Sequence, residues 1–91
     1  MKKNEFEAIF QTTSRDMNHG AVIDAAGYYV QITRQPAGRR CLYTFDDTPQ
    51  TRSLIERYEL RQPLGIPAKT ILNSRTELYH QSIRVCRGGE I

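Results

Sequence analysis

The stretch RRCLYTFDDTP, residues 39–49, decides the fold because it joins a strand directly to a helix. Cysteine, tyrosine and phenylalanine occupy every second position from Cys41 to Phe45, and this period of two predicts a half-buried strand. Asp47 and Thr48 carry side-chain oxygens that can accept the free N–H groups of a helix start, and Pro49 suits the first helical position. We therefore assign Asp47 and Thr48 a structural role.

The segment before this stretch predicts an antiparallel partner strand. Residues 28–34 alternate in polarity, and Gln35–Gly38 contains the proline and glycine of a tight turn. A four-residue loop would pair Arg34 with Arg39 and place six apolar side chains on one face. These six are Tyr28, Val30, Ile32, Cys41, Tyr43 and Phe45. The other face would carry Tyr29, Gln31, Thr33, Arg40, Leu42 and Thr44.

One further strand and three helices are expected around this hairpin. Residues 6–11 predict a short edge strand, and Asp16–Ala26 predicts a helix of small side chains that ends at Gly27. Helices from Pro49 to about Arg61 and from Pro67 to about Val85 follow, separated by a linker with two prolines. The apolar arc of the last helix comprises Ala68, Ile71, Leu72, Leu78, Tyr79, Ile83, Val85 and Cys86.

These elements predict a single α+β domain over residues 1–91, with a tail at residues 87–91. A small antiparallel hairpin or meander of two or three strands would be covered on one face by three helices, in the order β-α-β-β-α-α. Gly20, inside the small-residue helix, costs about 1 kcal/mol relative to alanine. We therefore expect tertiary packing to hold that helix in place, through close approach to a neighbour.

Composition and charge limit the classes of function. The chain is 38% hydrophobic and 25% charged, as in a soluble domain, and it contains no apolar run long enough for a membrane span. We expect no signal peptide, and we expect Cys41 and Cys86 to be buried free thiols in a reducing, cytoplasmic setting. The net charge of +3 is concentrated in the last third, and ten of the 13 basic residues are arginine, which favours an anionic partner.

The sequence offers little for catalysis. Asp46 and Asp47 are adjacent carboxylates, but the helix start accounts for them better than acid/base chemistry does. His19 and His80 are each expected alone on a solvated helix face, so we assign no catalytic, cofactor-binding or metal-ligating residue. An enzyme would need Asp46, Asp47 and a histidine to converge in a pocket, and the expectation is a protein that is not an enzyme.

The last helix carries the most suggestive surface. Opposite its apolar arc, five polar and basic side chains fall within about 60° on a helical wheel. They are Lys69, Asn73, His80, Arg84 and Arg87. Arg39 and Arg40 beside the turn could add to this charge, and Tyr29 could supply a stacking surface. The alternative is a merely solvated face.

Arg75 stands out because the wheel places it inside the apolar arc of the last helix. A buried guanidinium must be paired or must extend to water. A structural ion pair, or a side chain that extends to water, is the expected outcome, and a ligand-binding arginine is the alternative. The candidate partners are Asp24, Asp46, Asp47 and Glu59.

The order of these pieces resembles a family of small domains of unknown function carried by phages, plasmids and integrative elements. The matching pieces are TTSRD at residues 12–16, Gly27, YTFDD at residues 43–47, GIP at residues 65–67, and Arg75 in the last helix. The resemblance implies a mobile element in a bacterial cytosol and no assigned enzymatic activity.

These features together favour a non-catalytic accessory binding module without cofactors. It would bind nucleic acid or a protein partner through its basic surface, and the sequence does not separate these partners. A DNA- or RNA-binding regulator that uses the last helix, an inhibitor of a host defence complex, and a homodimer all remain open.

Overall fold

The computed structural model describes residues 10–35 and 40–88, apart from the side chains of residues 86–88. Within these residues it confirms the α+β class and the order β-α-β-β-α-α. The strands are β1 (Gln11–Ser14), β2 (Gln31–Arg34) and β3 (Cys41–Asp46). The helices are α2 (Met17–Ala25), α3 (Pro49–Glu59) and α4 (Ala68–Gly88).

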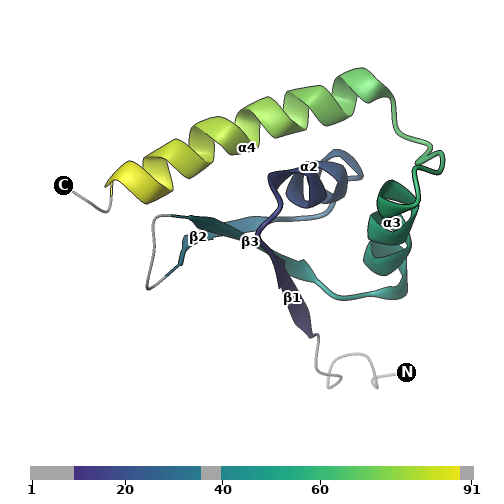
Figure 1. Cartoon of the computed structure of the whole chain (residues 1–91), viewed down its shortest axis with the longest axis horizontal. Coiled ribbons are helices and arrows are strands. Elements are labelled where there is room, and N and C mark those ends of the chain that lie inside the picture. Colours follow the sequence, from purple (N-terminus) through teal and green to yellow (C-terminus); the bar gives the residue numbers. More distant parts are fainter. Residues whose placement is uncertain (1–9, 36–39, 89–91) are drawn as a thin grey trace, which may run out of the picture.

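The sheet has the strand order β1-β3-β2, and β3 pairs antiparallel with both neighbours. The strand that leads directly into α3 is therefore the centre of the sheet. The outer strands β1 and β2 run parallel to each other, with α2 as the connection between them. Figure 1 shows α4 running over α2 and, toward its C-terminal end, over β2, which it contacts directly.

Most of the edge strand expected at residues 6–11 falls outside the described residues. Residues 1–9 lie outside the described part of the chain, and the strand observed beside β3 is Gln11–Ser14. Its side chains pair across to β3: the hydroxyls of Thr13 and Thr44 lie 3.0 Å apart. Thr12 and Thr13 suit this strand, because the β-branched threonine is a good strand former.

The predicted hairpin is correct, but its register is wrong by two residues. Cys41 lies opposite Arg34 and not opposite Ile32, and the Gln35 N–H donates to the Arg40 carbonyl at 2.9 Å. A shift of two residues keeps every side chain on its predicted face, because side chains alternate with a period of two. The connection then falls at residues 36–39, outside the described residues.

The core is built on the face of the hairpin that was predicted to be apolar. Its buried cluster is Ile23, Val30, Cys41, Tyr43 and Phe45, against which Met17, Ile32, Leu54, Ile55 and Val85 pack. Tyr28, expected in this face, is 39% exposed because β2 begins only at Gln31.

The apolar arc predicted for α4 is only partly correct. Leu78 is buried, as expected, but Leu72 and Tyr79 are 62% and 50% exposed. Ser74 and Ser82 are buried instead. Ser82 lies against β3, near Cys41 and Tyr43. Its hydroxyl donates to the Tyr79 carbonyl at 2.8 Å, so the buried hydroxyl keeps a hydrogen-bond partner. In the described part of the chain, no helix, the 21-residue α4 included, combines the length and apolarity needed to cross a bilayer.

Gly20 is the point where α2 touches both of its neighbours. A β-carbon at this position would lie 3.2 Å from Leu78 Cδ1 of α4 and 3.3 Å from Tyr43 Cβ of β3. The helix is therefore held by packing on two sides, as expected.

Replacing Gly20 by valine should lower the free energy of unfolding by about 2 kcal/mol, since a branched side chain overpacks the contact with Leu78 and Tyr43. Urea denaturation measures the change. The matched control is Thr76→Val at an exposed position of α4, expected to change stability by less than about 0.5 kcal/mol. Equal effects at the two sites would contradict the close packing.

The helix ends follow the local sequence signals closely. Asp16 caps α2, its carboxylate accepting from the Asn18 N–H at 2.8 Å. Thr48 caps α3 through a reciprocal pair of bonds with Thr51, and Pro49 takes the first helical position. The role of Asp47 differs from the expectation, because its carboxylate pairs with Arg52 at 2.6 Å and does not cap the helix.

Helices α2 and α3 end in the same hydrogen-bonding motif with different residues. After α2, Gly27 has φ +99 and the Tyr28 N–H reaches the Ile23 carbonyl at 3.2 Å. After α3, Arg61 adopts φ 59 in the equivalent position. Glycine takes this left-handed conformation freely, whereas a residue with a β-carbon is strained there.

The substitution Arg61→Gly should therefore raise the free energy of unfolding by about 1 kcal/mol, while Gly27→Ala should lower it by about 1 kcal/mol. An added β-carbon at Gly27 would meet nothing within 4 Å, so the effect there reports backbone conformation alone. Thermal or urea unfolding tests both. Loss of stability in Arg61→Gly would show that the arginine side chain matters more than the backbone strain.

Cys41 is disulfide-bonded, which corrects the expectation of free thiols. Its Sγ lies 3.5 Å from the Ser82 carbonyl oxygen, and a disulfide sulfur has no hydrogen to donate. Val85 packs on the cluster that contains Cys41, so the fold brings the last turns of α4 to the start of β3. Cys86 follows Val85, and its side chain lies outside the described residues. The disulfide removes the argument for a reducing compartment.

Burial raises the pKa of the Tyr43 hydroxyl above its ordinary value of 10.0. Its hydrogen bond with Ser82 and the nearby charge of Arg75 act in the opposite direction but are smaller effects. The ring is only 3% exposed. The folded state therefore holds the Tyr43 proton more tightly than the unfolded chain does.

Above about pH 10 the unfolded chain loses the Tyr43 proton first, so stability that is complete below this pH should fall as the pH rises. Tyr43→Phe should flatten this alkaline loss, although it removes a hydrogen bond worth about 1 kcal/mol at neutral pH. Urea unfolding between about pH 8 and 11 measures both effects. Tyr29→Phe, at a 78% exposed ring, is the control that should follow the wild type.

Candidate functional site

The basic face predicted for the last helix forms one exposed row on α4, here called the basic strip. Its described members, Lys69, Asn73, His80 and Arg84, are all exposed. α4 is continuous from Ala68 to Gly88, so the helical spacing keeps these side chains on one side. The side chain of Arg87 and the whole of Arg39 lie outside the described residues.

The structure joins Tyr29 to the basic strip. A groove of about 480 Å³ runs between the start of β2 and the C-terminal half of α4. It is lined by Tyr29, Val30, Gln31, Ile32, Gln81, Arg84 and Val85. Tyr29 and Arg84, proposed separately from the sequence, therefore share one concave surface. Arg40 is exposed at the start of β3 but does not line this groove.

An apolar row borders the basic strip on α4. Leu72 and Tyr79 lie two turns apart and are largely exposed. The Tyr79 ring stands edge-on to His80, with 5.8 Å between the ring centroids. The outward side of α4 thus combines cations, the Asn73 amide and two apolar side chains.

The prediction for Arg75 is correct only in part: the side chain reaches solvent, but it is not buried and its partner is not a carboxylate. Its side chain is exposed, and its Nε donates to the Asn18 Oδ1 at 2.7 Å. None of the four carboxylates expected as partners forms an ion pair with Arg75 within residues 10–35 and 40–88. Because α4 crosses α2 near its first turn, an amide acceptor is within reach, and an exposed guanidinium needs no compensating carboxylate. Arg75 therefore ties α4 to α2.

His19, expected to be solvated and alone, is the centre of a polar network that the sequence pattern did not indicate. The side chain is only 18% exposed. Its Nδ1 lies 2.8 Å from the Ser14 hydroxyl, and its Nε2 lies 3.0 Å from Glu59 Oε2. The ring also packs edge-on against Tyr58. His19 thus links the end of β1, the first turn of α2 and the last turn of α3.

This network could be seen in the sequence only in part. The three-residue spacing of Asp16 and His19 at a helix start is visible, and Asp16 Oδ2 lies 3.7 Å from His19 Nε2. Glu59 is 40 residues away, and only the packing of α3 against α2 brings it to the imidazole.

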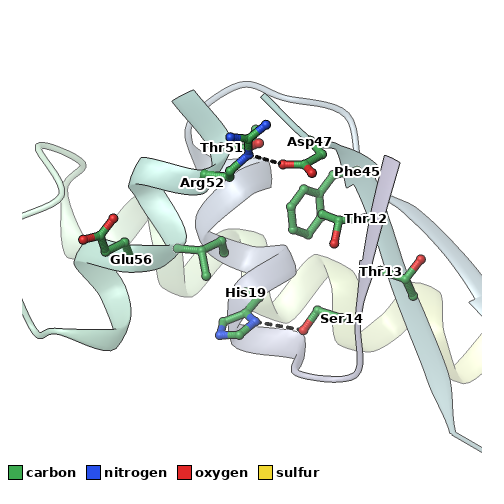
Figure 2. A pocket seen from close by; sticks show the side chains of 10 residues that line it. Thr12, Thr13, Ser14, His19, Phe45, Asp47, Thr51, Arg52 and Glu56 are labelled. Atoms are coloured by element: carbon green, nitrogen blue, oxygen red, sulfur yellow. Dashed lines mark hydrogen bonds and ion pairs between the residues drawn. The ribbon is translucent and has the colours of Figure 1, made fainter. Parts of the chain in front are cut away.

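A pocket of about 490 Å³ lies beside this network, between β1, β3 and helices α2 and α3 (Figure 2). It is lined by Thr12, Thr13, Ser14, His19, Phe45, Asp47, Thr51, Arg52, Ile55 and Glu56. In Figure 2 the Asp47–Arg52 pair and the His19–Ser14 pair lie at opposite ends, with Phe45 between them.

The groups that an enzyme was expected to require do not all meet in this pocket. Asp47 and His19 line it, but Asp46 does not, and the Asp46 carboxylate accepts from the Gln11 amide at 3.3 Å. The Ser14 hydroxyl also accepts the Asp16 backbone N–H at 3.0 Å, which engages it in the turn between β1 and α2. The hydrogen bonds of Asp46 and Ser14 are thus explained by a structural role, since each joins neighbouring parts of the fold.

Comparison with known proteins finds no match to this chain among family models, curated proteins or solved structures.

Proposed function

We propose that this protein is a non-catalytic binding module that contacts single-stranded nucleic acid through the basic strip and the groove at its end. The observation that carries the proposal is that Tyr29 and Arg84 line the same groove. An aromatic ring beside a guanidinium provides a stacking platform next to a phosphate contact, the combination used by proteins that bind single strands.

The dimensions of the surface suit a short segment of the strand. Lys69 and Arg84 are separated by about 22 Å along α4 at 1.5 Å per residue, so the basic strip can meet several phosphates of one strand. The exposed Tyr29 ring can stack on one base, which is worth about 1–3 kcal/mol. Few cations are involved, so the affinity should be modest and strongly dependent on salt.

A protein partner is the second candidate, and the apolar row on α4 favours it. Leu72 and Tyr79 are exposed at a helical spacing that a hydrophobic groove on another protein can accept. The resemblance to domains of mobile elements, which implies no enzymatic activity, agrees with either partner. A second copy of the chain and a component of a host defence complex both fall within this candidate.

Fluorescence anisotropy with a labelled 15-nucleotide single strand and the matching duplex, at about 50 and 200 mM salt, tests the first candidate. The single strand should bind more tightly, and its affinity should fall several-fold at the higher salt. Lys69→Gln with Arg84→Gln should reduce the salt dependence, and Tyr29→Ala should weaken single-strand binding at least fivefold. The matched control is Arg15→Gln with Arg57→Gln, which removes two exposed charges outside α4.

Equal losses in the two double variants would show that net charge, and not the basic strip, controls binding. The absence of any nucleic-acid complex would reject the first candidate. Light scattering of the free protein then separates a self-associating chain from a monomer, and Tyr79→Ala should dissociate any dimer built on the apolar row.

A further inference from the structure

Three potential metal ligands, His19 among them, lie close together, away from the surface proposed for nucleic acid. One atom each from Asp16, His19 and Glu59 lies within 4.8 Å of the others. They come from the start of α2 and the last turn of α3, so only the tertiary fold assembles them. This cluster, here called the Asp-His-Glu cluster, has no part in the binding surface on α4.

We propose that the Asp-His-Glu cluster binds a divalent transition-metal ion of the zinc class. Zinc bonds to imidazole nitrogen and carboxylate oxygen are about 2.0–2.2 Å long, so tetrahedral ligands lie about 3.3 Å apart. His19 Nε2 is already 3.0 Å from Glu59 Oε2 and 3.7 Å from Asp16 Oδ2. Both carboxylates are partly exposed, at 57% and 44%, so their side chains can close the remaining distance.

The surroundings of His19 hold the imidazole in the orientation that a metal ligand needs. Its Nδ1 forms a hydrogen bond with the Ser14 hydroxyl at 2.8 Å, and this bond directs Nε2 toward the two carboxylates. A hydrogen bond to the second ring nitrogen is the usual support of a metal-binding histidine. The edge of Tyr58 restrains the ring further, with 5.6 Å between the centroids.

The two carboxylates also favour a cation between them. His19 Nε2 carries at most one hydrogen, and it donates that hydrogen to the Glu59 carboxylate at 3.0 Å. Asp16 Oδ2 lies 3.7 Å from Nε2, which is beyond hydrogen-bond distance. The other oxygen of Asp16 already caps α2, accepting from the Asn18 N–H at 2.8 Å. A metal ion would bond to both carboxylates at once, and it would balance their two negative charges.

The donor set selects the class of ion. One imidazole nitrogen with two carboxylate oxygens suits zinc, cobalt and related transition ions, whereas magnesium and calcium prefer oxygen ligands alone. Three protein ligands would leave one tetrahedral position for water. The bound ion would join the β1–α2 connection to the end of α3, so its expected effect is to stabilise the fold.

Proton NMR during titration with zinc chloride tests the proposal on the oxidised full-length protein, in a buffer without chelators. The chain has two histidines, so their ring signals can be assigned by the His80→Ala variant. The His19 signals should shift and saturate at one equivalent of zinc, while the His80 signals should stay in place. Zinc in excess should also raise the melting temperature by several degrees.

Variants separate metal binding from a structural role of the same residues. Glu59→Gln keeps a hydrogen-bond acceptor for His19 but removes a charged ligand, so the protein should remain folded and bind zinc at least tenfold more weakly. Ser14→Ala should weaken binding about tenfold by freeing the ring. Glu56→Gln, an exposed carboxylate one turn earlier on α3, is the matched control and should bind zinc as the wild type does.

Two results would overturn the proposal. Zinc that shifts only His80, or that binds Glu59→Gln as tightly as the wild type, would be bound elsewhere on the surface. If zinc leaves both the His19 signals and the melting temperature unchanged, His19 serves only as a hydrogen-bonded link between β1, α2 and α3.

Discussion

The close approach of α2 to β3 and α4 at Gly20 is the contact on which the rest of the structure depends. Leu78 and Tyr43 occupy the space that a side chain at this position would need. Leu78 is buried on α4 together with Ser74 and Ser82, whereas the larger Leu72 and Tyr79 are left exposed. At Gly20, α4 turns its Leu78 side toward α2, and the apolar row lies on a different side of the helix.

The two regions of interest are separate results of this arrangement. On one side of α2, α4 presents the basic strip and meets β2 at the groove that Tyr29 and Arg84 line. On the other, α3 brings Glu59 to His19, beside the pocket of Figure 2. A binding surface and a candidate metal site can therefore coexist in one small domain, because they use different neighbours of the same helix.

Much of the fold could be predicted because its signals are local. The alternation through Cys41–Phe45, the cap at Thr48 and Pro49, and the glycine at the end of α2 each act within a few residues. The hairpin register was wrong by two residues because apolar alternation has the same period as the error. The basic strip was predictable for the same local reason, since a regular helix places residues on a face by spacing alone.

The amino-acid sequence by itself determined the elements, their order, the faces of the hairpin and the charge on α4. The tertiary structure alone decided the pairing of β1 with β3, the disulfide state of Cys41, the amide partner of Arg75 and the network of His19 with Ser14 and Glu59. The physical reason is the distance along the sequence over which each interaction acts. Caps and alternation depend on neighbours along the chain, whereas these contacts join residues that only the packing of α2 against α3, α4 and the sheet brings together.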